Sequence, residues 1–369
     1  MAATRSLWRR VAALLGSLLG GVFAAGDARA VGLPEDVAEA MAHLFQGGGV
    51  TASGPALLIR KSIADKVSLT GTYYGDFVSN ASIDVVTTAS PFRESRNAYG
   101  LGLNYAVRDT LITVAAATSR EPDYTADTVN VDLAQDVFGG MTTIALGFTR
   151  GADKVYKTGD AGFSETADHW RYRLGVTQIL SPDWLMTANF EAISDDGFLA
   201  NPYRVAFVFG AAVPERVPST RTSRALQLRA IGDLGERNVV TGIYRYFWDT
   251  WGITAHTAEI GYARYFGADW LASGFVRYHA QQGASFYSDN ATADTAYVSR
   301  NRQLSTFSDV GVGLNLSYTA VKRTGAYAVT VTGAIEGMTF NYSDFTDIRT
   351  GQLYSFNALL AQLLVSVNF

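Results

Sequence analysis

Charged side chains of both signs recur on one parity of the alternating segments of this chain, and they are its strongest candidates for chemistry. Burial of such charges in the dry interior of a protein costs free energy of hydration unless the charges pair. Two uses stay open: a ladder of ion pairs that braces an interior, which mixed signs favour, and the lining of a selective passage. The set comprises Asp76, Asp132, Asp136, Arg171, Arg173, Glu191, Arg229, Arg245, Glu259, Arg277, His279, Asp309 and Glu336.

The histidines are the candidates for acid and base catalysis, and the chain has four: His43, His169, His256 and His279. A hydrolase would need a nucleophile beside one of them and a carboxylate to orient the ring. Ser, Thr and Asp are too common here to identify such partners. The sequence therefore identifies no catalytic constellation and predicts a protein that is not an enzyme, with an envelope lipid or glycan hydrolase kept as an alternative.

Metal and cofactor signals are weak. Asp195, Asp196, Asp344 and Asp347 could hold a divalent cation, but their spacing lacks the Gly and bidentate Glu of a calcium loop, and solvated loop carboxylates are favoured. Gly311-Val312-Gly313 has no following helix to hold a pyrophosphate. With no Cys there is no thiolate site. We expect neither a metal nor a cofactor.

The elements that position these side chains alternate apolar and polar residues with period two, which is typical of strands. In residues 169–179, Trp170, Tyr172 and Leu174 share one face, and Arg171 and Arg173 share the other. Such segments span residues 66–78, 96–107, 110–119, 127–137, 141–151, 168–180, 183–194, 221–232, 237–248, 255–266, 269–282, 303–319, 326–341 and 355–369.

Short and long connections alternate between these segments. Arg108-Asp109 and Ser181-Pro182 are short links, whereas residues 195–220 form a long one. Aromatic residues on the apolar parity gather toward segment ends, as in the girdles at membrane interfaces. These features predict an all-β, transmembrane, antiparallel up-and-down barrel of about fourteen strands, with a range of fourteen to sixteen. A soluble β-sandwich is the disfavoured alternative.

The first part of the chain differs from the rest. Residues 1–30 combine Arg5, Arg9 and Arg10 with an apolar run and a small-residue cleavage site, which predicts a secretory signal peptide. Residues 31–47 resemble a short helix that ends at the glycines from Gly47. We expect residues 31–62 to form a helical, Gly-rich segment that is either a lumen plug or, over 50–62, an extra strand, and residues 63–369 to form the barrel. A further strand over Tyr203 to Val213 is another way to reach sixteen strands.

The chain ends on an aromatic residue of the apolar parity, Phe369. The last strand of a barrel must pair with an early one so that no edge meets lipid. The ending resembles the C-terminal signature of substrates of the outer-membrane barrel assembly machinery, which makes Phe369 the candidate assembly residue. The net charge of -4 gives no sign of a nucleic-acid partner.

Several stretches carry a resemblance to a known family. They are residues 47–61 and 81–94, Asn201-Pro202-Tyr203-Arg204, Arg221-Thr222-Ser223, residues 244–262 and residues 302–307. The chain resembles the bacterial outer-membrane family catalogued as domain of unknown function 3570 (DUF3570). The resemblance implies an exported barrel in the outer membrane of a Gram-negative bacterium, without established ligand residues. We therefore expect a channel, transporter or export element among outer-membrane lipids and envelope proteins, with a scaffold for a surface complex as a further alternative. Cargo and oligomeric state are left open.

Overall fold

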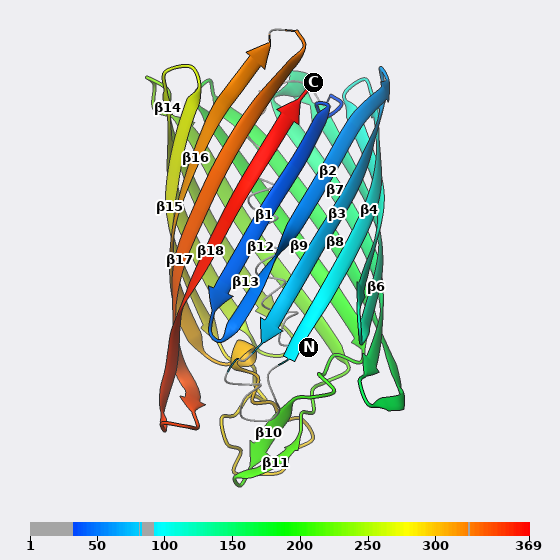
Figure 1. The fold of residues 1–369 in the computed structure, drawn as a ribbon, viewed down its shortest axis with the longest axis vertical. Helices are drawn as coiled ribbons and strands as arrows, with labels where there is room; N and C mark the ends of the chain where they lie inside the picture. Colours follow the sequence, from blue (N-terminus) through cyan, green and yellow to red (C-terminus); the bar gives the residue numbers. More distant parts are fainter. Residues whose placement is uncertain (1–31, 81, 83–91, 324) are drawn as a thin grey trace.

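The computed structural model describes residues 32–80, 82, 92–323 and 325–369, and it shows a closed antiparallel barrel (Figure 1). Neighbouring barrel strands follow the chain order, and β1 closes the ring on β18. Two further strands pair only with each other. The barrel strands are β1 (Val37–Gly47), β2 (Val50–Ala64), β3 (Val67–Asn80), β4 (Phe92–Val107), β5 (Thr110–Glu121), β6 (Tyr124–Val137), β7 (Thr142–Lys157), β8 (Asp160–Ser181), β9 (Trp184–Gly197), β12 (Thr220–Asp233), β13 (Asn238–Asp249), β14 (Thr254–Phe266), β15 (Trp270–Gln282), β16 (Phe307–Arg323), β17 (Tyr327–Asp347) and β18 (Gln352–Asn368).

The connections divide between the two ends of the barrel. The start of β1 and the end of β18 lie at the end with the short turns, uppermost in Figure 1. The opposite end carries the long connections from β9 to β12 and from β15 to β16. These contain the hairpin of β10 (Val205–Val208) and β11 (Ala211–Pro214) and the 3-10 turn η2 (Arg302–Leu304). A second 3-10 turn, η1 (Phe138–Gly140), joins β6 to β7.

The outer face of the barrel is apolar, as period two in a membrane-facing wall requires. Leu101, Ile260 and Leu314 are 75%, 70% and 61% exposed on it. Aromatic side chains mark its borders: the Trp270 ring stacks on Tyr318 with centroids 4.4 Å apart, near the short turns. In the part of the chain that the structure describes, no helix is long and apolar enough to cross a membrane.

The apolar and polar parities exchange sides toward the long-loop ends of β16 to β18. Ile335 and Leu359 are exposed on the outer face, but beyond them Thr339 and Asn357 face outward and hydrogen-bond to each other. The side chains on the opposite parity there are buried and apolar. We call this inner surface the apolar wall, which consists of Phe307, Met338, Phe340, Tyr342, Phe345, Ala358 and Leu360.

The predicted N-terminal helix is wrong, because residues 37–47 form β1. Alanine, methionine and leucine favour a helix locally, but β1 pairs along its whole length with both β18 and β2. That pairing provides partners for the backbone N–H and C=O groups that a helix would have paired internally. Tertiary context therefore overrides local propensity. The glycines expected to end that helix form a tight turn instead, since Gly48 and Gly49 both adopt positive φ, at 57° and 79°.

Other boundaries change with it. Of the two alternatives for this segment, the structure shows the strand, as β2. Residues 37–64 thus supply two strands of the wall, and the barrel begins at Val37, not at residue 63. The ring has sixteen strands, two more than the central expectation of about fourteen. The segment Tyr203 to Val213 contains β10 and most of β11, which form a hairpin of their own and are not strands of the barrel wall. The predicted signal peptide falls outside the described residues.

The closing seam is held by contacts between the two ends of the chain. The backbone N–H of Phe369 donates to the carbonyl of Asp36 at 3.2 Å, and the Lys61 ammonium lies 4.7 Å from the centre of the Phe369 ring. Lys61 also binds the Asp36 carboxylate at 2.6 Å. This bond, with the N–H of Ser62, lowers the pKa of Asp36 to about 2, so the carboxylate is charged at neutral pH.

Replacing Ala40 by proline tests whether β1 is a wall strand. The variant removes a ladder N–H from a strand paired on both edges, and an unpaired backbone group in lipid costs on the order of several kcal/mol. We expect A40P to lose the folded, heat-modifiable band in electrophoresis after refolding into detergent, whereas A40V, which keeps the N–H, retains it. Normal folding of A40P would show that β1 does not close the barrel.

Candidate functional site

A polar inner face on β6 to β9 carries five of the predicted charges, and Asp132, Arg171, Arg173 and Glu191 lie close together on it. Asp132, Gly147 and Arg173 stand directly opposite one another on three successive strands. A side chain on Gly147 would come within 2.3 Å of the Asp132 carboxylate, so glycine leaves room for Arg173 to reach over the middle strand and bind Asp132 at 2.6 Å. Arg173 also donates to Asn130 Oδ1 at 2.7 Å. We call this face the polar wall; it consists of Asn130, Asp132, Thr149, Arg171, Arg173, Thr187 and Glu191.

The same arrangement recurs across the barrel. Arg277 on β15 binds Glu336 on β17 over Gly311 of β16, whose added side chain would lie 2.9 Å from the Glu336 carboxylate. Glu259 stands beside Arg277 on β14, and Arg229 interacts electrostatically with Glu259. The predicted charges therefore alternate in sign along this side.

The remaining predicted charges have separate surroundings. Arg171 pairs with Glu191 at 3.4 Å, and Arg245 lies 5.4 Å from the centre of the Phe247 ring. Asp309 stands opposite His279 in the β15–β16 ladder and is buried. Asp76 and Asp136 are also buried: Asp76 binds His43, and Asp136 accepts from Thr143 at 2.5 Å.

The histidines contact aspartate, tyrosine and threonine side chains. His43 binds Asp76 at 2.7 Å, and His169 lies between Asp153 and Asp195, each at 2.6 Å. His256 contacts the Tyr244 hydroxyl at 2.7 Å, and His279 contacts Thr257 at 2.8 Å through its Nδ1. In a catalytic triad Nδ1 faces the orienting carboxylate, so Thr257 does not occupy the position of a nucleophile beside His279.

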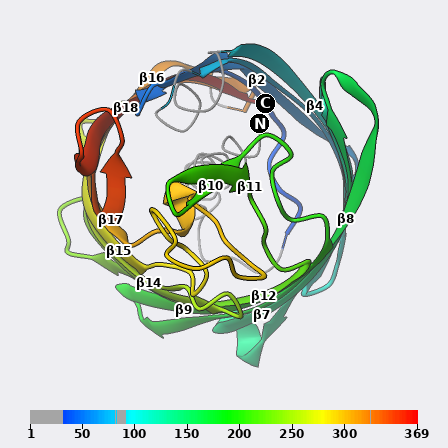
Figure 2. The same cartoon turned by 90° about the horizontal axis from the view of Figure 1, so that it is seen from below.

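Three connections fold together over the long-loop mouth, and we call them the cap. They are residues 198–219 between β9 and β12, residues 250–253 between β13 and β14, and residues 283–306 between β15 and β16. Seen along the barrel, the cap lies within the outline of the ring, and the β10–β11 hairpin projects beyond the strand ends (Figures 1 and 2). The cap is therefore the structure that any solute entering this mouth meets first.

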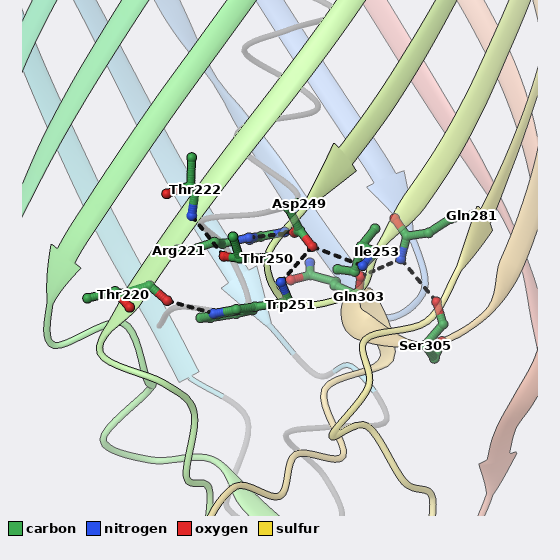
Figure 3. Close-up of polar contacts among 10 residues, drawn as sticks. All are labelled: Thr220, Arg221, Thr222, Asp249, Thr250, Trp251, Ile253, Gln281, Gln303 and Ser305. Carbon is green, nitrogen blue, oxygen red and sulfur yellow. Dashed lines mark hydrogen bonds and ion pairs between the residues drawn. The ribbon is translucent and has the colours of Figure 1, made fainter.

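The Asp249 carboxylate joins the cap to the wall (Figure 3). Its side chain is fully buried, and it accepts hydrogen bonds from the Arg221 guanidinium at 2.5 and 2.8 Å and from the backbone N–H groups of Trp251 and Ile253, both at 2.9 Å. Trp251 Nε1 donates to the carbonyl of Thr220 at 2.9 Å, and Arg221 stacks on the Trp251 ring at 4.6 Å. One carboxylate thus organises the start of β12 and the β13–β14 turn.

The long β15–β16 connection is held from both sides. Gln281 Nε2 donates to the carbonyls of Gln303 and Ser305, at 2.9 and 3.0 Å (Figure 3). On the other side the connection packs on the apolar wall and its strands: Arg300 lies 4.4 Å from the centre of the Phe345 ring, and Tyr287 Oη donates to the carbonyl of Asp344 at 3.1 Å. Arg302 also lies 5.3 Å from the centre of the Phe356 ring, so the connection docks on β15, β17 and β18.

Contacts within the cap unite its two long connections. The buried Glu215 carboxylate accepts from Ser299 Oγ at 2.5 Å and lies 3.5 Å from Arg204. Ala206, Val208, Ala291 and Val298 form a small apolar core between the connections. Tyr203 links the cap to the β7–β8 turn, where it accepts from the N–H of Thr158 at 2.6 Å, and burial raises its pKa.

Acidic side chains are the candidates for cation binding. The ligand atoms of Glu94, Glu121 and Asp123 lie within 4.8 Å of one another on β4, β5 and the turn that follows. The carboxylates predicted to be solvated in loops differ from expectation. Asp195 and Asp347 are 3% and 8% exposed and lie in β9 and β17, where they bind His169 and Arg349. Their strands extend past the membrane-facing segments that alternation had defined.

Sequence reasoning missed the cap and its anchor. Asp249 directly follows the expected strand 237–248 and precedes a Trp-Gly turn, which is a usual position for a side chain that caps backbone N–H groups. The apolar wall also had a signal, because Met338, Phe340 and Tyr342 break the outward apolar parity of their own strand. Arg300 and the partners of Gln281 lie in a connection without periodicity.

Comparisons with known proteins agree with this geometry. The model of a family described as a protein of unknown function (DUF3570) matches residues 71–330. No curated protein matches the sequence. Among solved structures, a bacterial polysaccharide outer membrane secretin is 8% identical, with 91% of this chain and 100% of that chain covered and a TM-score of 0.50. This likeness shows that the chain has the fold of outer-membrane β-barrels.

Two further structures have lower scores. The siderophore receptor PirA from Pseudomonas aeruginosa is 10% identical over 90% of this chain and 80% of that chain, with a TM-score of 0.45. A FadL homologue from Pseudomonas aeruginosa is 9% identical over 91% of each chain, also with a TM-score of 0.45.

The two glycine-spanned ion pairs differ in burial, which gives a matched stability test. In the Arg277–Glu336 pair the side chains are 14% and 5% exposed, and in the Arg173–Asp132 pair 39% and 37%. We expect R277M to lower the free energy of unfolding in vesicles by about 3 kcal/mol or more, because it strands a buried carboxylate. R173M should cost roughly 0–1 kcal/mol. Equal losses in urea titrations would contradict this account of the inner face.

Proposed function

This chain belongs to the DUF3570 family, and we propose that it is an integral outer-membrane channel or transporter whose long-loop mouth is restricted by the cap. The observation that carries the proposal is the pairing of a charged, polar inner face with a mouth that structured connections fold over. A barrel that served only as an anchor would gain nothing from charged side chains on its inner wall, because even paired charges lose free energy of hydration in an enclosed interior.

The orientation follows from the lengths of the connections. Outer-membrane barrels place short turns in the periplasm and long loops outside the cell. The cap then faces the exterior, and the closing seam at Phe369 lies at the periplasmic border. We place the chain among outer-membrane lipids, with residues 1–30 removed on export and with the barrel assembly machinery recognising Phe369. The exposed ring of Phe369 on the outer face supports that last assignment.

The contacts favour passage over hydrolysis. The hydrolase alternative needs a histidine beside a serine hydroxyl, with a carboxylate on the other nitrogen. His169 contacts carboxylates through both ring nitrogens, and the Nε2 of His43 contacts the Asp76 carboxylate and the Tyr74 hydroxyl. The cap, and not a plug formed by residues 31–62, restricts the passage in this proposal. Removing residues 31–62 would take away β1 and β2 and open the wall instead of the passage.

Loosening the cap should increase conduction. In D249A, Arg221 and the N–H groups of Trp251 and Ile253 lose their common acceptor, so the anchor of the β13–β14 turn is lost. We expect purified protein in planar bilayers to conduct weakly or intermittently, and D249A to show a larger mean conductance with more frequent open events.

The matched control is D168A. Asp168 pairs with Arg150 at 2.8 Å, but both side chains are more than 40% exposed, and they lie on the outer face above the apolar band. This variant should conduct like the parent. Silence of both the parent and D249A, with the folded band intact, would refute the channel proposal.

A further inference from the structure

The cap covers the inner face unevenly. The β15–β16 connection packs on the apolar wall, where Phe345 is fully buried and Leu360 is 2% exposed. Its hydrogen bonds to the barrel strands include Thr306 N–H to Asp344 at 2.8 Å and Gln281 to Ser305, on β17 and β15. The recorded docking contacts of this connection therefore gather on one side of the lumen.

Ion pairs on the inner face report where water remains. On the cap side, the side chains of His43 and Asp76 are 1% and 0% exposed, and those of Arg277 and Glu336 are 14% and 5% exposed. On the polar wall, Arg171 and Glu191 are 41% and 28% exposed, close to the values for Arg173 and Asp132. Nearer the cap on the same strands, the side chains of His169, Asp153 and Asp195 are 19%, 8% and 4% exposed. The exposed ion pairs therefore indicate that the hydrated part of the lumen lies along the stretch of β6 to β9 around Arg171 and Arg173.

The chemistry of the polar wall suits a particular class of solute. Its members are charged, amide or hydroxyl side chains, and Gly147 and Gly175 add no apolar surface between them. Each cation has an anion beside it: Arg173 binds Asp132, and Arg171 pairs with Glu191. A wall of adjacent opposite charges has no preferred sign of ion, yet it can exchange partners with a solute that carries both charges.

We propose that the passage runs along the polar wall of β6 to β9 and takes small hydrophilic solutes that carry both a cationic and an anionic group. This inference rests on the proposed channel function and adds its route and its class of substrate. Arg173 and Asp132 act in it as specificity-determining residues at the wall.

Cysteine labelling tests the route without requiring any current. The chain has no native Cys, so T149C and T187C on the polar wall and M338C on the apolar wall can be compared on an unmarked background. With the proteins in lipid vesicles, we expect a membrane-impermeant charged thiol reagent to modify the polar-wall cysteines about tenfold faster than M338C. Equal rates, or faster labelling of M338C, would overturn the route whether or not the channel conducts.

Solute entry into the same vesicles tests the class of substrate. The probes are glycylglycine, which is zwitterionic, and arabinose, which is neutral and of similar size. We expect R173Q and D132N each to slow glycylglycine entry roughly two- to fivefold while arabinose entry stays unchanged, because each removes one charge of the pair. Equal slowing of both solutes, or of neither, would refute the substrate class while leaving the channel intact. If neither solute enters vesicles that hold the parent protein or D249A, the channel proposal itself is rejected.

Discussion

The closure of the sheet is the constraint on which the rest of this structure depends. In lipid an unpaired strand edge leaves backbone groups without partners, so the wall has to end on itself. Here β1 meets β18 over eleven paired positions, from Val37 with Asn368 to Gly47 with Ala358. Closure in turn separates two faces that a flat sheet could not keep apart, one for lipid and one for an interior. The interior can then be polar, apolar or both.

Both kinds of interior occur in this barrel, and the difference has a structural cause. β17 runs to Asp347 and β8 starts at Asp160, so both strands extend beyond the outer apolar band at the long-loop end. In that region water surrounds the outer face, and the hydrophobic effect favours apolar side chains on the inner one. The apolar wall therefore forms where the strands leave the membrane. It gives the cap a surface to pack on, while the polar wall keeps its charges hydrated.

The sequence predicted what period two controls and missed what register and long-range pairing control. Alternation located the barrel, its outward apolar face and the inward charges, because side chains in a strand sort by parity alone. It could not pair Asp132 with Arg173, since that contact depends on the register of three strands and on Gly147 between them. It misjudged β1 because the residues of β1 favour a helix until two neighbours bind both edges. It did not predict the cap, because the residues of the cap show no periodic alternation of apolar and polar side chains.

Two of the attachments of the cap, at Asp249 and at the apolar wall, differ in strength. At one side a few hydrogen bonds converge on Asp249, and each such bond contributes roughly 0.5–1.5 kcal/mol, or somewhat more where a charge takes part. At the other side the aromatic side chains of the apolar wall are buried, at roughly 1.5–3 kcal/mol for each one withdrawn from water. Detaching the cap from β17 would expose several of them at once. Breaking the Asp249 contacts therefore costs less than detaching the cap from the apolar wall.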